Sequence, residues 1–66
     1  MNIDIMRGAI AEMFKTNGLF AVAMGWHKNK VSAMLNGRYV PDGDEAAMMA
    51  HVLRLNEEKF CQIFLH

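Results

Sequence analysis

The sequence predicts an all-α domain of five short helices. Its 66 residues include one cysteine, one proline and seven basic against seven acidic residues. Apolar residues recur at steps of three and four along nearly the whole chain, and no stretch shows the alternation of a half-buried strand. A chain of this length buries only about 60% of the surface that its unfolded form exposes, so we expect a single domain spanning residues 1–66.

The first two helices are predicted from an apolar stripe and a cap. The first is expected over residues 3–14, where the helical spacing of the apolar side chains gathers them on one face. These side chains are Met6, Ile10, Met13 and Phe14. The Thr16 hydroxyl can accept a hydrogen bond from a free backbone N–H of the following turn, so a second helix is expected from there to Met24.

Two glycines flank the third helix, one before it and one after it. Gly25 suits the left-handed backbone conformation in which a helix ends and the chain turns. The next helix is expected over residues 28–35. Its inward side chains are Val31, Met34 and Leu35. Asn36 and Gly37 then end it, because these two residue types best tolerate a positive φ at a helix end.

A loop at Pro41 precedes the last two helices. Asp42 or Asp44 can cap a fourth helix that runs to about Leu53, and Asn56 can cap a fifth over about residues 56–66. The apolar residues of the fourth helix include Ala47, Met48, Ala50 and Val52. The last helix has one apolar face of Phe60, Ile63 and Phe64, and a second of Cys61 and Leu65 at a four-residue step.

Charge is segregated along the chain although the net charge is zero. Residues 13–41 carry four cations and no acid, whereas residues 42–66 carry five acids against two cations. A basic middle beside an acidic end indicates one face that meets an anion and another that avoids it. An ordinary scatter of solvated charges is the alternative interpretation.

Several function classes are not expected from the residues present. We find no paired carboxylates, no nucleophile beside a base and no glycine-rich phosphate loop, so no enzyme is predicted. The three histidines and Cys61 lack a metal-ligand spacing, and no cofactor or small-molecule ligand is expected. A lone cysteine and the lack of an apolar run of roughly 20 residues favour a cytoplasmic protein without a membrane span or a signal peptide.

Residues 16–37, TNGLFAVAMGWHKNKVSAMLNG, have the layout of a helix-turn-helix. Two short helices cross steeply only with a small residue at the closest approach, a permissive turn residue and apolar flanks, which Ala21, Gly25 and Val31 supply. The segment resembles the DNA-binding domain of the lambda repressor and Cro family. The positions that carry the resemblance are Thr16-Asn17, Phe20-Ala21, Gly25-Trp26 and Asn36-Gly37, and it extends over residues 49–56.

This resemblance implies a phage-repressor-like transcriptional regulator that binds double-stranded DNA. The third helix then lies in the major groove and the second crosses the backbone. Lys28, Asn29 and Ser32 can hydrogen-bond to base edges, and Ala33 can touch a thymine methyl group. The candidates for phosphate contacts are Asn17, His27, Lys30, Asn36 and Arg38.

The pattern of the last helix predicts a partner, because a single neighbouring surface of the same chain cannot cover both of its apolar faces. A second copy can cover the outer face through a two-fold interface, so Phe60, Cys61, Phe64 and Leu65 are the expected dimerisation residues. The same helix folding back to bury both faces is the alternative. For function, the alternative is a protein-interaction module, an antirepressor or adaptor on the same fold, whose third helix never meets DNA.

Overall fold

The helices are those that the sequence predicts, with small shifts at their ends. A computed structural model describes residues 1–65, and no strand occurs among these residues. The helices are α1 (Ile3–Met13), α2 (Asn17–Met24), α3 (Lys28–Leu35), α4 (Gly43–Val52) and α5 (Glu57–Phe64). The expectation of an all-α, five-helix architecture is confirmed. Residue 66, the end of the expected last helix, lies outside the described residues.

Each helix begins with a side chain that accepts a hydrogen bond from a backbone N–H of the first turn. Thr16 Oγ1 accepts from Leu19 N at 3.1 Å, and Asn56 Oδ1 accepts from Lys59 N at 2.7 Å. The five caps are Asn2, Thr16, His27, Asp42 and Asn56. These bonds satisfy donors that a helix leaves free at its start, and so they fix where each helix begins.

Three helices end in the same left-handed turn. Gly25 has φ 72° after α2, Gly37 has φ 77° after α3, and Arg54 has φ 53° after α4. In each case the N–H of the next residue returns to the helix; those bonds are Trp26 N to Ala21 O, Arg38 N to Ala33 O and Leu55 N to Ala50 O. Glycine has no steric cost in this conformation, whereas Arg54 adopts it with a full side chain.

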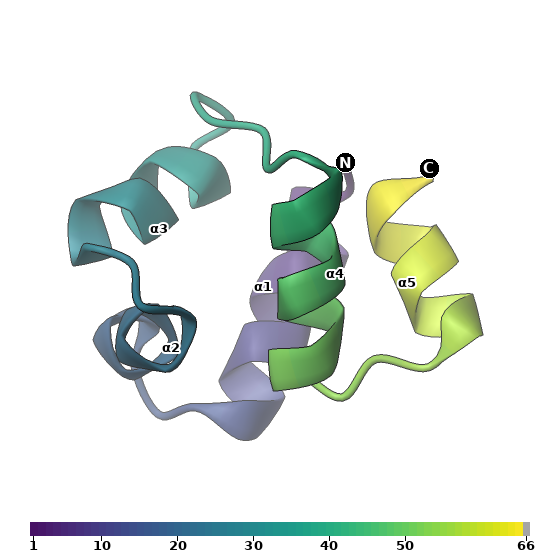
Figure 1. Ribbon diagram of the computed structural model, residues 1–66, viewed down its shortest axis with the longest axis horizontal. Coiled ribbons are helices and arrows are strands. Elements are labelled where there is room, and N and C mark those ends of the chain that lie inside the picture. The colour runs from purple at the N-terminus through teal and green to yellow at the C-terminus, as the bar shows by residue number, and fades with distance from the viewer. Residues whose placement is uncertain (66) are drawn as a thin grey trace.

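The helices enclose one core, with α1 behind α4, α2 and α3 to one side and α5 to the other (Figure 1). In this view α2 is seen nearly end-on while α3 lies across the picture, so the two cross steeply. The N-terminus lies close to the last turn of α5, since Asn2 N donates to Ile63 O at 2.7 Å. This arrangement leaves one side of α3 facing solvent.

Every helix contributes to the core. Its largest members are at most 1% exposed: Met6 and Ile10 of α1, Phe20 of α2, Met34 of α3, Met49 of α4 and Ile63 of α5. The predicted inward face of α3 is confirmed, because Val31 and Leu35 are buried beside Met34. In α4 the buried side chains are those of Ala46 and Met49, whereas Met48 is 44% exposed.

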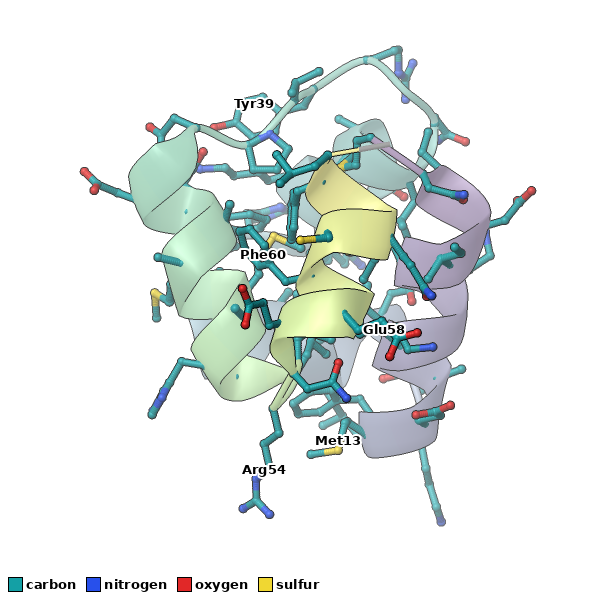
Figure 2. The ribbon with its side chains drawn as sticks, turned by 90° about the vertical axis from the view of Figure 1, so that its right-hand side faces the viewer. Met13, Tyr39, Arg54, Glu58 and Phe60 are labelled. Carbon is teal, nitrogen blue, oxygen red and sulfur yellow. The ribbon has the colours of Figure 1, made fainter. Side chains whose placement is uncertain are left out.

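The expected inward position of Met13 is wrong. Its side chain is 42% exposed, and Figure 2 shows it at the lower end of α1. The helix ends there, and Phe14 takes an extended conformation. The Phe14 ring then packs edge-on against the ring of Phe20, with 5.7 Å between their centroids. Because the chain turns after Met13, Phe14 rather than Met13 is the last residue of the predicted apolar face that packs on the core.

Candidate nucleic-acid interface

The outer side of α3 is a polar face on a helix whose inner side is buried. Lys28, Asn29 and Ser32 are exposed, and Asn36 continues this face beyond the end of the helix. Their side chains carry hydrogen-bond donors and acceptors of the kinds that read base edges. Four of the predicted contact residues thus lie together on one surface.

The start of α3 carries a histidine cap and no acidic residue. His27 Nδ1 accepts a hydrogen bond from Asn29 N at 3.1 Å, and the side chain is exposed. The first turn of α3 contains Lys28 and no carboxylate. Because the N-terminal end of a helix is the positive end of its dipole, this end of α3 favours an anion.

A cation that the sequence pattern does not single out lies at the other end of α3. Arg7 of α1 donates from Nη2 to Leu35 O at 3.1 Å, across 28 positions of the chain. This bond occupies one of the carbonyl groups that the helix leaves free at its end. Arg38, one of the predicted phosphate contacts, is exposed just after α3. Nothing in the local pattern around Arg7 indicates this contact, which depends on how α1 packs.

The outer side of α2 is largely apolar. Asn17, the predicted contact residue of this helix, is exposed in its first turn. Farther along, Leu19 is 50% exposed and Val22 is 77% exposed. The second helix therefore offers a single amide beside two apolar side chains that are at least half exposed.

Lys30 does not lie with the other predicted contact residues. Its Nζ is 2.6 Å from Glu45 Oε2 and lies 4.4 Å from the centroid of the Trp26 ring and 5.0 Å from that of Tyr39. The ammonium group is turned toward α4 and paired there, so it is a poor candidate for a phosphate contact. Ala33 is half-buried and adds little to the outer face of α3.

Glu45 is the acid that neutralises this lysine. The hydrogen bond from Lys30, then those from the Tyr39 hydroxyl and the Asp42 N–H, lower the pKa of Glu45 to about 2. Donation to the same carboxylate raises the pKa of both Lys30 and Tyr39. The Glu45 side chain is 17% exposed. In the folded protein this carboxylate is therefore ionised at every pH above about 3.

Acid is expected to remove the stabilisation that Glu45 provides. Because the pKa of Glu45 is lower in the folded than in the unfolded chain, its contribution is present above about pH 5 and is lost as the pH falls toward 2. Glu45→Gln should therefore lose less thermal stability than the wild type between these pH values. Thermal unfolding at both pH values measures this, with Glu12→Gln, an exposed acid of α1, as the matched control. Equal losses in the wild type and Glu45→Gln would contradict the assignment.

The predicted dimerisation residues of α5 divide into two groups. Cys61 is exposed and Leu65 is 72% exposed. Phe60 and Phe64 are half-buried and pack against each other, with their rings tilted by 40° and 4.8 Å between the centroids. In Figure 2 the Phe60 ring lies between α4 and α5. The helix thus turns one apolar face to its own core and leaves Cys61 and Leu65 uncovered.

Comparison with known proteins identifies no relative of this chain, so a functional conclusion depends on the chemistry of these surfaces. Searches against protein-family models, curated proteins and solved structures found no match to the chain. Within residues 1–65, no helix combines the length and apolar character needed to cross a bilayer. The same part of the chain has no group of three His, Cys, Asp or Glu side chains arranged to hold a metal ion.

Proposed function

We propose that this protein binds double-stranded DNA in a sequence-dependent manner, as a phage-repressor-like helix-turn-helix regulator whose α3 enters the major groove. The exposed polar face of α3 carries the proposal. It lies on a short helix that a three-residue connection, residues 25–27, joins to α2, and it combines amide, hydroxyl and ammonium groups. Such a helix presents its outward side chains, mainly those of its first turns, to base edges.

The side chains of this face have distinct roles in the proposal. Asn29 pairs with adenine through its amide, Lys28 reaches the O6 and N7 acceptors of guanine, and Ser32 donates to or accepts from either base. Each well-made contact contributes about 1–3 kcal/mol of discrimination against a wrong base. These contacts give the protein its sequence preference.

Phosphate contacts come from groups at the two ends of α3 and from the first turn of α2. Arg38 and Arg7 lie at the C-terminal end of α3, and Asn17 of α2, His27 and Asn36 add polar side chains. Lys30 is left out of this set because Glu45 neutralises it. With few cations per chain, binding by one copy is weak and falls steeply as salt rises, by about 0.9 logarithmic units per contact.

Two copies acting together supply the missing affinity. A second chain that packs on Cys61 of α5 and on Leu65 just after it covers the apolar side chains left exposed there. The two copies of α3 then lie about 34 Å apart, one turn of DNA, and read an inverted repeat. This dimer is part of the proposal.

Selection of bound duplexes from a random DNA pool at about 50 mM salt tests the proposal. We expect enrichment of an inverted repeat whose half-sites are separated by about 10 base pairs. Sedimentation of the selected complex should give two chains per duplex. Enrichment of a single half-site would contradict the dimer alone, whereas no enrichment over a protein-free control would contradict DNA binding.

The apolar outer side of α2 favours a second candidate function, a protein-interaction module. Leu19 and Val22 expose more apolar surface than a helix lying on phosphates needs. An adaptor or antirepressor would use that surface and would not need the polar face of α3. Retention on heparin at low salt, with steep loss as salt rises, distinguishes the two, because only the DNA-binding protein should show it.

A further inference from the structure

Three segments of the chain meet at one carboxylate. Glu45 of α4 binds Lys30 of α3 through Oε2, and its Oε1 accepts from the Tyr39 hydroxyl in the segment between the two helices. Oε1 also accepts from Asp42 N at 3.1 Å, which completes a capping box at the start of α4. Each carboxylate oxygen is therefore engaged, and the two partner side chains belong to different segments.

An aromatic series supports this cluster from the core. The rings of Phe20 and Trp26 meet edge-on with 6.4 Å between their centroids, and those of Trp26 and Tyr39 do the same at 6.4 Å. Phe20 is fully buried. The Lys30 ammonium lies over the rings of Trp26 and Tyr39, an arrangement that is itself attractive. The cluster is thus anchored to the interior on one side and to α4 on the other.

The cluster matters because α3 otherwise packs mainly on α2. The principal helix contacts are α2 with α3, α2 with α4, α1 with α2 and α1 with α5. The Lys30–Glu45 pair links the first turn of α3 to the first turn of α4, and the Tyr39 hydroxyl holds the connecting segment to the same acid. We refer to Lys30, Tyr39 and Glu45 as the α3 clamp.

We propose that Glu45 is a positioning residue for α3, acting through Lys30 and Tyr39 so that the α3 clamp fixes the angle at which α3 meets the DNA groove. This inference rests on the proposed function. A hydrogen bond to a base edge weakens steeply when its angle is poor, so a small tilt of α3 lowers discrimination more than it lowers phosphate binding. Lys30 therefore acts on sequence preference without touching the DNA.

A charge-balanced double variant tests the clamp. Lys30→Met with Glu45→Gln removes one positive and one negative charge and keeps the lysine's apolar stem. Its matched control is Glu12→Gln with Lys59→Met, an acid and a lysine that line a groove between α1 and α5. Tyr39→Phe is a milder third variant that keeps the ring and loses only the hydroxyl. All are compared at a temperature where their circular dichroism shows them folded.

Amide hydrogen exchange without DNA is the first measurement. We expect about tenfold faster exchange in α3 and residues 36–45 of the double variant, with α1 and α5 unchanged, because local opening precedes global unfolding. Tyr39→Phe should show a smaller change in the same segments. Acceleration spread evenly over all five helices, or none in α3, would overturn the clamp whether or not the protein binds DNA.

Binding to the selected duplex and to a scrambled one is the second measurement. In the double variant the ratio of the two affinities should fall about tenfold, while the salt dependence stays that of the wild type. An unchanged ratio in a variant with a loosened α3 would overturn the positioning role. The single variant Glu45→Gln tests the alternative role of Lys30. If it tightens binding to every duplex and steepens the salt dependence by about 0.9, Lys30 contacts phosphate once Glu45 no longer pairs with it, and the positioning role is overturned. A wild type that binds neither duplex contradicts the proposed function, and the exchange result still decides whether the clamp holds α3.

Discussion

Replacing Phe20 by alanine is expected to unfold much of the protein at room temperature. The Phe20 side chain is fully buried, and its ring contacts those of Phe14 and Trp26. Removing a buried phenylalanine ring costs about 3–5 kcal/mol, because apolar burial is lost and a cavity remains. At about 0.05–0.15 kcal/mol per residue, the whole chain has only about 3–10 kcal/mol of stability.

Urea unfolding followed by circular dichroism measures this effect. Val22→Ala is the control, since this side chain lies on the same helix but is 77% exposed, and it should change the free energy of unfolding by no more than about 0.5 kcal/mol. A cooperative transition in Phe20→Ala close to that of the wild type would mean that the aromatic series is not the centre of the core.

Asn29→Ala and Arg38→Ala are expected to weaken DNA binding in two different ways. Asn29 lies on the outer face of α3, so its loss should remove about 1–3 kcal/mol of preference at one base pair and leave binding to unrelated duplexes nearly unchanged. Arg38 lies after the helix and is assigned to phosphate. Its loss should weaken binding to all duplexes alike and flatten the salt dependence by about 0.9.

Titration of both variants with the selected duplex and its single-base-pair substitutions separates these effects. The salt series is run on the selected duplex and on one scrambled duplex. The control is Glu12→Gln with Lys59→Met, which should match the wild type in both measurements. If both variants lose the same affinity for every duplex, α3 does not lie in the groove as assigned.

Local chemistry explains why the helices could be predicted from the sequence. The bounds of α3 and the caps Thr16 and Asn56 agree with expectation, because each depends on residues within about one turn. The positive φ of Gly25 and Gly37 was likewise expected, since glycine is the residue that enters this conformation without cost. Of the two candidate caps of α4, the structure selects Asp42.

The features that were missed depend on contacts between distant segments or on unusual residues. The position of Lys30 depends on Glu45, 15 residues away, and that of Arg7 depends on Leu35, 28 residues away, and no local spacing shows either contact. His27 was expected at phosphate and is the cap of α3, a position usually held by Ser, Thr, Asp or Asn. The left-handed Arg54 was missed because glycine normally marks such a turn.

Methionine is unusually well distributed in this small core. The buried methionines are Met6, Met24, Met34 and Met49, one in each of α1 to α4, while Met13 and Met48 are more than 40% exposed. Isotopic labelling of methionine methyl groups therefore places one nuclear magnetic resonance reporter inside each of four helices, with two solvent-facing reference signals in the same spectrum. A tilt of α3 would appear first in the signal of Met34. Because the spectrum contains only seven methyl resonances, that tilt can be followed without a full assignment of the chain.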